Sequence, residues 1–187
     1  MKISIANTND IVGVLELQEK YLLINTPNAV RAGGFVTTPF TKNQIETVIA
    51  NKKLFVAKLD DKIVAYMFAG AWDFWKQWEI FPFMAAKLPH LSFLEHKLTD
   101  INTFQYGPVC IDASQRGTTL FPTLFETMRI EMKTEFKVGI TFINQINRRS
   151  YEAHTKKLGM KVIDKFHFNN NNYYTLAFET SKSVLNI

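Results

Sequence analysis

The spacing of apolar residues in the second half of the chain predicts a strand, helix, strand, helix order. Two short apolar runs, Phe104 to Ile111 and Val138 to Ile143, have the composition of buried strands. The first run leads through a polar turn to a helix that opens near Leu120. The second leads to a helix that Asn147 can cap and Gly159 can end. We expect the two strands to lie parallel, joined by a right-handed crossover.

The rest of the chain predicts five further strands and two further helices. The strands are Lys2 to Ala6, Leu54 to Leu59, Ile63 to Ala69, Lys161 to Phe168 and Tyr173 to Glu179. One helix has a cap at Thr8 or Asn9 and an apolar stripe that includes Ile11, Val14, Leu15 and Leu22. The other opens with a capping box, Thr41 with Gln44.

Glycine, proline and asparagine mark the connections between these elements. A loop is expected from Asn25 to Pro39, and turns at Asp60 to Lys62 and at Asn169 to Asn172. From Met84 to Leu98 the pattern predicts one or two short helices, interrupted by Pro89.

The segment from Gly70 to Thr103 is rich in aromatic residues and holds all three tryptophans, Trp72, Trp75 and Trp78. Such side chains can wall a pocket for an apolar or cationic amine. They can equally form a satellite core or a dimer contact. Both interpretations stay open at this point.

The polar turn around Arg116 and Gly117 is a candidate anion site. The first turn of a helix has backbone N–H groups without partners inside the helix, and the helix dipole is positive at that end. A strand that enters a helix through such a turn suits a phosphate or pyrophosphate. Pro122 lies early enough in the helix for its missing N–H to do no harm. Many strand-to-helix turns contain glycine and bind nothing, so this signal alone is weak.

The two strand–helix segments together resemble a known family. The residues that carry the resemblance are Arg116, Gly117 and Leu124 after the first strand, and Asn147, Ser150, His154 and Lys157 to Met160 after the second. Their spacing is similar to that of the GNAT superfamily of acyl-CoA-dependent N-acetyltransferases. The similarity covers the second half of the chain strongly and the first half in element order only.

This resemblance implies an α+β fold with α/β/α layers. A mixed, partly splayed sheet of about six to seven strands would be flanked by about four helices, with an aromatic-rich insertion (about 70–103) before the central strand. Residues 1–187 would form a single acyl-CoA N-acyltransferase domain. In the family, the pantetheine arm of CoA pairs with the first of two splayed parallel strands, and the pyrophosphate rests on the turn and the helix N-terminus.

The resemblance also implies a function: transfer of acetyl from acetyl-CoA to the amine of a small molecule, by direct attack in a ternary complex. The implied cofactor-binding residues are Val109, Cys110, Ile111, Arg116, Gly117, Thr118, Thr119, Leu120, Phe121, Asn147 and Ser150. The candidate substrate-binding residues are Trp72, Trp75 and Trp78. Thr119 and Phe121 replace the small residues that the family usually has there. A second hypothesis is therefore a GNAT-like acyl-CoA-binding or interaction domain with little or no activity.

Acetyl transfer needs a base for the amine and a proton donor for the leaving thiolate. His154 stands seven residues after Asn147, where family members often have a tyrosine, and Tyr151 is the other candidate donor. Each has ordinary packing as its alternative role, and one residue more than usual lies between His154 and Gly159. The first candidate for the base is Glu79, and Asp73 and Asp112 are the alternatives. No covalent intermediate is needed, so Cys110 is expected to be a core residue.

Composition narrows the class of protein further. The chain has 187 residues, of which 47% are hydrophobic and 21% charged, as in globular proteins. A single cysteine excludes an internal disulfide and suits a reducing cytoplasm. The net charge is +5, and its basic clusters are too sparse for a nucleic-acid footprint. We expect no membrane span, signal peptide or metal site, since His90 and His96 are poorly spaced for a metal; a homodimer remains open.

Overall fold

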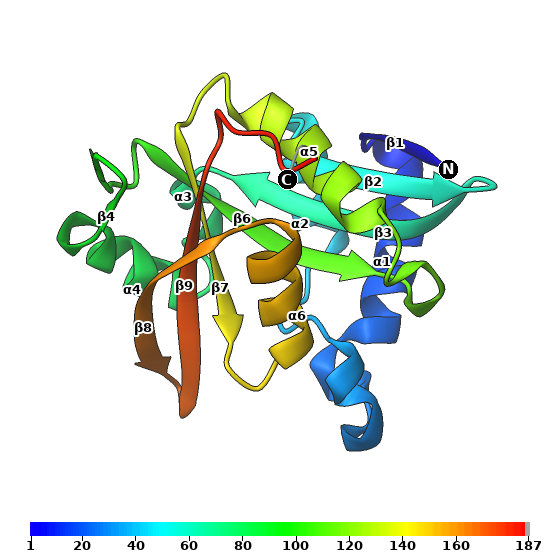
Figure 1. Cartoon of the computed structure of the whole chain (residues 1–187). Coiled ribbons are helices and arrows are strands. Elements are labelled where there is room, and N and C mark those ends of the chain that lie inside the picture. The colour runs from blue at the N-terminus through cyan, green and yellow to red at the C-terminus, as the bar shows by residue number, and fades with distance from the viewer. Residues whose placement is uncertain (186–187) are drawn as a thin grey trace. The chain divides into compact units, whose positions relative to one another are not determined.

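The computed structural model describes residues 1–185, apart from the side chains of Ala29, Val30 and Ala32. A seven-stranded sheet has the hydrogen-bonded order β1-β2-β3-β6-β7-β9-β8, and a small sheet pairs β4 with β5 (Figure 1). The strands are β1 (Lys2–Ile5), β2 (Leu54–Leu59), β3 (Lys62–Gly70), β4 (Ser92–Phe93), β5 (His96–Lys97), β6 (Thr103–Ile111), β7 (Val138–Asn144), β8 (Lys161–Phe168) and β9 (Asn171–Glu179). The expected mixed sheet of six to seven strands is confirmed.

Six α-helices occur within residues 1–185. They are α1 (Ile11–Tyr21), α2 (Lys42–Ala50), α3 (Trp72–Trp75), α4 (Ile80–Lys87), α5 (Leu120–Met132) and α6 (Arg148–Glu152). The expected total of about four is too low, because α3 and α4 of the aromatic-rich segment add to the four helices predicted elsewhere.

The chain forms two compact units. The first unit comprises Met1–Phe68 and Gly107–Glu131, and the second unit comprises Ala69–Tyr106 and Met132–Ile187. Strand β6 begins in the second unit and ends in the first, so the chain passes between the units at Tyr106 and Gly107.

In the first unit, β1 and β2 pair antiparallel, and β2 and β3 form a hairpin. Asp60 and Asp61 connect them with φ angles of 49° and 61°. Aspartate tolerates this left-handed backbone, whose twist suits a two-residue hairpin turn. The β6 part of this unit continues the sheet, since the Asp112 N–H donates to the Val64 carbonyl at 2.8 Å. The predicted hairpin is confirmed, with a turn shorter than the expected Asp60 to Lys62, because Lys62 is the first residue of β3.

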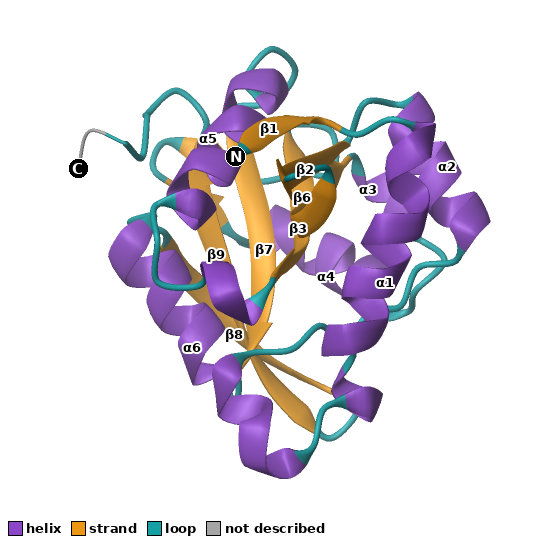
Figure 2. Ribbon diagram, turned by 90° about the vertical axis from the view of Figure 1, so that its right-hand side faces the viewer, coloured by secondary structure: helices purple, strands orange, loops and turns teal. Residues whose placement is uncertain are grey.

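Helices α1 and α2 lie side by side in the first unit (Figure 2). A short 3-10 helix, η1 (Thr8–Asp10), precedes α1, and its cap is Asn7, which forms a capping box with Asp10. The predicted caps Thr8 and Asn9 are thus wrong by one or two residues, because the chain makes a 3-10 turn before the α-helix starts. The capping box of Thr41 with Gln44 at the start of α2 is confirmed.

The connection between α1 and α2 is more ordered than a plain loop. It contains two 3-10 helices, η2 (Leu23–Asn25) and η3 (Asn28–Gly33). A parallel bridge joins Leu22 to Val36, with the Leu23 N–H donating to the Val36 carbonyl at 2.9 Å. These bonds fold the connection back onto the end of α1.

In the second unit, β6 and β7 run parallel, with Gln105 opposite Ile140 as the last registered pair. This confirms the predicted parallel pair. Strand β9 then pairs antiparallel with β7 and with β8. The β8–β9 turn is shorter than predicted: Asn169 and Asn170 alone connect the strands, with φ angles of 45° and 58°.

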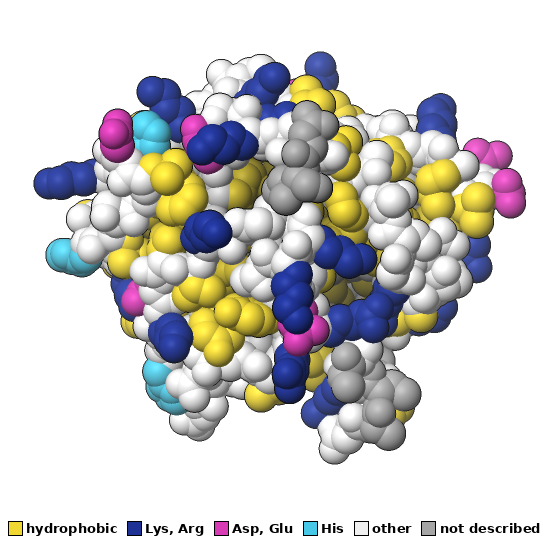
Figure 3. All heavy atoms as spheres, in the orientation of Figure 1, with side chains coloured by type: hydrophobic (Ala, Val, Ile, Leu, Met, Phe, Trp, Pro, Cys, Tyr) yellow, Lys and Arg dark blue, Asp and Glu magenta, His cyan; other side chains and the backbone are white. Residues whose placement is uncertain are grey.

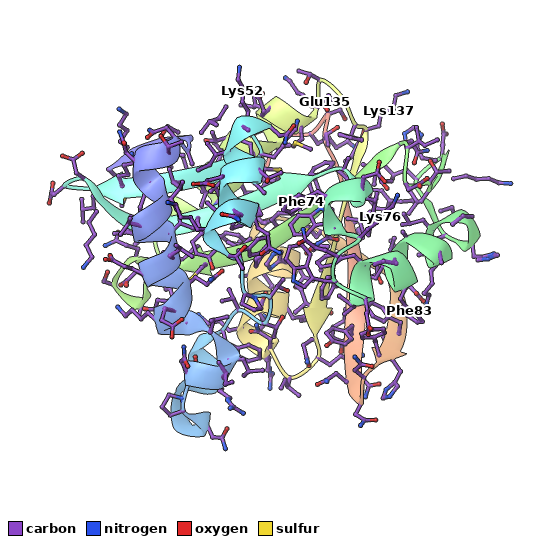
Figure 4. All side chains as sticks on the ribbon, turned by 180° about the vertical axis from the view of Figure 1, so that it is seen from behind. Lys52, Phe74, Lys76, Phe83, Glu135 and Lys137 are labelled. Atoms are coloured by element: carbon purple, nitrogen blue, oxygen red, sulfur yellow. The ribbon has the colours of Figure 1, made fainter. Side chains whose placement is uncertain are left out.

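The aromatic-rich segment builds part of the core of the second unit. Trp75 stacks on Phe81 with ring centroids 4.9 Å apart, and Phe81 contacts Phe142 of β7 at 5.3 Å. Phe83 of α4 lies over β8, 5.7 Å from Phe166 (Figure 4). Helices α3 and α4 therefore pack on the sheet through their aromatic side chains.

The helices predicted between Met84 and Leu98 are only partly present. Helix α4 ends at Lys87, and Pro89 lies in a 3-10 helix, η4 (Leu88–His90). The strands β4 and β5 follow as a hairpin, with Leu94 in its turn at φ 54°. Proline cannot continue the hydrogen-bond ladder of a helix, so a change of structure after Lys87 has a local cause.

None of the helices in residues 1–185 combines the length and the apolar content that a membrane crossing requires.

Candidate functional site

The first unit contains the predicted strand, turn and helix. Strand β6 ends at Ile111, the segment Asp112–Thr119 (the phosphate turn) follows, and α5 begins at Leu120. Asp112 starts the turn by accepting hydrogen bonds at Oδ1 from the Ser114 N–H (3.0 Å) and hydroxyl (2.8 Å). A short 3-10 helix, η5 (Ala113–Gln115), lies within it.

The backbone N–H groups of Gly117, Thr118 and Thr119 have the properties of an anion site. Gly117 has φ 85°, and a Cβ built on it would meet no atom within 4 Å. These three residues are exposed, and in the part of the chain that the structure describes the N–H groups of Gly117 and Thr119 meet no acceptor. They directly precede the N-terminus of a 13-residue helix, whose dipole favours negative charge.

The side chain of Thr118 caps the N-terminus of α5. The Thr118 hydroxyl accepts from the Leu120 N–H at 3.2 Å and donates to the Gln115 carbonyl at 2.8 Å. Phe121, which replaces a small residue of the family pattern, is buried at 7% exposure. Its ring is therefore directed away from solvent.

The Arg116 guanidinium is bonded mainly to the protein itself. Its Nε donates to the Ile111 carbonyl at 2.8 Å, and its Nη1 donates to the Gly33 carbonyl. It also lies over the Tyr21 ring, 4.5 Å from the centroid. These contacts hold the turn in place beside the exposed residues Gly117 to Thr119.

Asp112 is an ionised group of this turn. Partial burial alone would raise the pKa of its carboxyl, but hydrogen bonds from Lys20 and Ser114 outweigh burial and hold the pKa well below the ordinary value. The same hydrogen bond raises the pKa of Lys20. Asp112 is thus a charged anchor of the turn, paired with Lys20 Nζ at 2.8 Å.

The backbone of strand β6 is irregular at Gly107 and Pro108. Gly107 has φ 104°, and Pro108 has no N–H to donate to a neighbouring strand. The predicted cofactor-binding residues Val109, Cys110 and Ile111 follow this irregularity. Regular ladder pairing cannot run unbroken through such a sequence.

Cys110 is a packed thiol. It is 3% exposed, and its Sγ lies 3.8 Å from the Leu17 carbonyl of α1. Burial raises the pKa of Cys110 to about 12, so the thiol is protonated at neutral pH. This environment agrees with the expectation that Cys110 is a core residue.

In the second unit, Asn147 caps α6 as predicted: its side chain accepts from the Ser150 N–H at 3.2 Å. A π-helical turn, η6 (Ala153–Lys157), continues α6, and Gly159 follows with φ 65°. A π-turn holds one residue more than an α-turn. This accounts for the extra residue between His154 and Gly159.

His154 lies inside the second unit with both ring nitrogens bonded. Nδ1 is 2.7 Å from the Ser150 carbonyl, so it carries the proton, and Nε2 accepts from the Tyr106 hydroxyl. Burial lowers the pKa of His154 to about 4, against the opposing effect of the Ser150 carbonyl. Burial also raises the pKa of Tyr106 well above its ordinary value. At neutral pH this is a neutral imidazole paired with a protonated tyrosine.

Tyr151 and Glu79 are more accessible. Tyr151 is half-buried, and its ring lies 4.7 Å from that of Tyr174. Glu79 is exposed at the start of α4. The alternative base Asp73 is also exposed and pairs with Lys76.

Two of the three tryptophans are core residues of the second unit. Trp72 is 3% exposed, and its indole N–H donates to the Thr103 hydroxyl at 2.9 Å. Trp75 is fully buried, and its indole N–H donates to the Gly70 carbonyl at 3.2 Å. Trp78 is half-buried, 5.9 Å from Trp75. For Trp72 and Trp75 these contacts are those of the core interpretation.

No sequence pattern pointed to Tyr106 or Tyr21 as residues of the candidate site. Tyr106 contacts His154, 48 residues away, and Tyr21 contacts Asp112, 91 residues away. No local spacing links residues so far apart. A tyrosine directly before the Gly-Pro pair was the one local signal for Tyr106.

No group of three or more metal-binding side chains gathers anywhere in residues 1–185.

Lys and Arg side chains are prominent over α6 (Figure 3), where Arg148, Arg149, Lys156 and Lys157 follow the Asn147 cap.

Neither a protein-family model nor a curated protein matches the sequence. Solved structures do match. An N-acetyltransferase from Staphylococcus aureus is 17% identical with a TM-score of 0.63, covering 96% of this chain and 98% of its own. YncA from Salmonella typhimurium, solved with its cofactor acetyl-CoA, is 13% identical (TM-score 0.63; 97% and 95%). A polyamine N-acetyltransferase from Drosophila melanogaster is 13% identical (TM-score 0.64; 95% and 99%).

The chain has the GNAT fold. The order of its strands and helices, the parallel pair β6 and β7, and the turn before α5 agree with this fold. Within it, the chain differs from the usual pattern at Thr119, Phe121 and His154, and in the π-turn η6.

The pKa of His154 predicts a pH dependence of stability. The unfolded chain protonates this imidazole below about pH 6.5, whereas the folded protein resists protonation until about pH 4. The stabilising contribution is therefore fully present above pH 6.5 and falls by roughly 3 kcal/mol as the pH drops to 4. In urea unfolding, the difference in free energy of unfolding between the natural protein and His154→Gln should shrink over this range.

The matched control is His167→Gln, at an exposed position of β8. It removes a histidine that solvent reaches, so it measures the effect of losing an imidazole that is not part of the core. A level difference for His154→Gln would contradict the assignment of His154 as a buried neutral imidazole.

Proposed function

We propose that the protein is an acetyl-CoA-dependent N-acetyltransferase whose acceptor is the amine of a small molecule. In this proposal residues 1–187 act as one acyltransferase domain in the cytoplasm, and the acetyl group passes directly to the amine in a ternary complex. The C–N bond forms as the C–S bond breaks, the amine loses a proton, and the CoA thiolate gains one.

The observation that carries the proposal is the phosphate turn. Three consecutive exposed residues, Gly117, Thr118 and Thr119, precede the positive end of α5. Backbone N–H donors at a helix N-terminus bind pyrophosphate without any basic side chain. The GNAT fold supports the same assignment, since the Salmonella typhimurium structure of this fold was solved with acetyl-CoA.

Strand β6 is the proposed binding site for the pantetheine arm of acetyl-CoA. Its registered pairs with β7 end at Gln105, and it continues to Ile111 past Gly107 and Pro108. We propose that backbone groups of Val109 to Ile111 accept the pantetheine arm as an added strand. In the second unit Asn147 and Ser150 form the cap of α6, and their contact with the donor stays a prediction from the sequence.

An amine acceptor is supported by the Drosophila melanogaster structure of this fold, which is a polyamine N-acetyltransferase. The tryptophans give less support than the sequence suggested, because Trp72 and Trp75 are buried with their indole N–H groups bonded. Trp78 alone of the three keeps a partly exposed ring. We therefore propose an amine without assigning it an apolar character.

Proton transfer is proposed for the side chains that solvent reaches. Tyr151 is the proposed donor to the thiolate, and Glu79 the proposed base for the amine. His154 is a weaker candidate than the sequence suggested, since both of its nitrogens are already bonded within the second unit.

The same histidine favours a second candidate function. A buried neutral imidazole stands where many family members have a tyrosine, and Thr119 and Phe121 replace small residues of the turn. A GNAT-like domain that binds acyl-CoA but transfers it slowly or not at all would have these features.

Release of free CoA thiol across a panel of amines separates the two functions. The panel contains polyamines, amino acids, aminoglycosides and a peptide with a free N-terminus. The enzyme proposal predicts amine-dependent thiol release for at least one class, with turnover on the order of 1 per second or faster. Stabilisation by acetyl-CoA with no release from any amine would support the binding domain instead.

The phosphate turn itself is tested by Gly117→Trp. A tryptophan there would cover the exposed amides, so the thermal stabilisation by saturating acetyl-CoA, expected to be about 5 °C or more for the natural protein, should vanish. Differential scanning fluorimetry with and without acetyl-CoA measures this.

Gly117→Ala is the matched control, because alanine has the same strain at φ 85° but little bulk. It should melt at about the same temperature as Gly117→Trp without ligand and keep most of the stabilisation with it. Full stabilisation of Gly117→Trp would place the phosphate site elsewhere.

A further inference from the structure

One tyrosine from α1 contacts the beginning of the phosphate turn. Tyr21 is the last residue of α1 and is 9% exposed. Its hydroxyl accepts a hydrogen bond from the Ala113 N–H at 2.7 Å and points its own proton toward Asp112 Oδ2 at 3.4 Å. The hydroxyl therefore bonds to the first two residues of the turn.

The ring of Tyr21 contacts Arg116, which lies further along the phosphate turn. The Arg116 guanidinium lies over the Tyr21 ring, 4.5 Å from the centroid, where cation–π attraction holds it. From there Arg116 donates to the Ile111 and Gly33 carbonyls. Gly117, the first of the exposed amides, comes next in the chain.

Apart from the Asp112 N–H, which donates to the Val64 carbonyl of β3 at 2.8 Å, the remaining bonds of the turn are local. The Gln115 N–H donates to the Asp112 carbonyl at 2.9 Å, and the Arg116 N–H to the Ala113 carbonyl at 3.3 Å. Bonds between near neighbours fix the shape of a turn but not its direction relative to the rest of the unit. That direction depends on contacts with other elements. The Val64 carbonyl of β3 holds the Asp112 N–H, and Lys20 and Tyr21 of α1 contact Asp112 and Ala113 through their side chains.

The charge of Asp112 makes this anchoring relevant to an anion. An uncompensated carboxylate near a pyrophosphate would repel it. Lys20 Nζ pairs with Asp112 Oδ2 at 2.8 Å, and the Tyr21 hydroxyl faces the same oxygen. The Asp112 carboxylate therefore anchors the phosphate turn, while the positive charge of Lys20 balances its negative charge.

We propose that Tyr21 is a positioning residue for the acyl-CoA donor. It fixes the direction in which the amides of Gly117, Thr118 and Thr119 point, and it acts through the turn rather than by touching the donor. Preformed donors bind an anion more tightly than donors that must first be ordered. This inference rests on the proposed function, because it assumes that the turn binds the pyrophosphate of acetyl-CoA.

The test compares two acetyl donors in Tyr21→Phe, which removes the hydroxyl and keeps the ring under Arg116. With acetyl-CoA, the Kd should rise roughly tenfold, as for the loss of a hydrogen bond linked to a charged group, while kcat and the KM for the amine stay within about twofold. S-acetylpantetheine has no pyrophosphate, so with this donor the variant should match the natural protein.

Tyr66→Phe is the matched control. The Tyr66 hydroxyl is also buried in the first unit, beside the Cys110 thiol and without an oxygen or nitrogen partner among residues 1–185. Its removal should leave the Kd for acetyl-CoA unchanged. Hydrogen exchange at the Ala113 amide gives a readout independent of any donor, and it should be faster in Tyr21→Phe only.

The outcomes are distinct. An unchanged Kd for acetyl-CoA in Tyr21→Phe would overturn the positioning role, and so would an equal loss with both donors, which indicates general damage to the fold. A natural protein that neither binds nor uses acetyl-CoA would overturn the proposed function and this role with it. A weakened Kd limited to acetyl-CoA, with faster exchange at Ala113, would support the inference.

Discussion

The proposed site depends on an irregularity in the backbone of strand β6 at Gly107 and Pro108. This strand belongs to both compact units, and its registered pairing with β7 extends from Thr103 to Gln105. Beyond Tyr106 the backbone contains a glycine with a positive φ and a proline without an N–H. A strand that cannot pair regularly along its whole length leaves backbone groups for another partner. In the proposed function, that partner is the pantetheine arm of the donor.

Buried polar side chains connect segments that are distant in the sequence. In the second unit, the Tyr106 hydroxyl bonds to His154, which in turn bonds to the Ser150 carbonyl of α6. In the first unit, Tyr21 of α1 bonds to the residues that follow β6. Burial of a polar group without a partner would be destabilising by about 1–3 kcal/mol. Each pair thus ties a helix to the strand or turn that carries the proposed site.

Much of this fold could be predicted because its signals are local. Thr41 with Gln44, the two aspartates of the β2–β3 turn, and Asn147 before α6 each determine structure within a few residues. Periodicity gave the strands their bounds to within a few residues. The hairpin β4–β5 was missed because its strands have two residues each, too few for any period to be visible.

The site was less predictable, because much of it depends on contacts between residues that are distant in the sequence. The exposed amides of the phosphate turn follow from Arg116, Gly117 and the start of α5, which are adjacent in the sequence. The surroundings of His154 and the burial of Trp72 and Trp75 depend on tertiary contacts that leave no local pattern. A histidine at the position of a family tyrosine therefore indicated a candidate acid, whereas its environment holds it neutral.

The central claim is that the amides of Gly117, Thr118 and Thr119 bind the pyrophosphate of acetyl-CoA. Backbone NMR of the ¹⁵N-labelled protein during titration with acetyl-CoA observes these three amides directly. Binding of the pyrophosphate at this turn predicts that their resonances shift strongly and saturate together with those of Val109 to Ile111. Resonances of Gly117 to Thr119 that stay unmoved at saturation, while amides elsewhere shift, would contradict it.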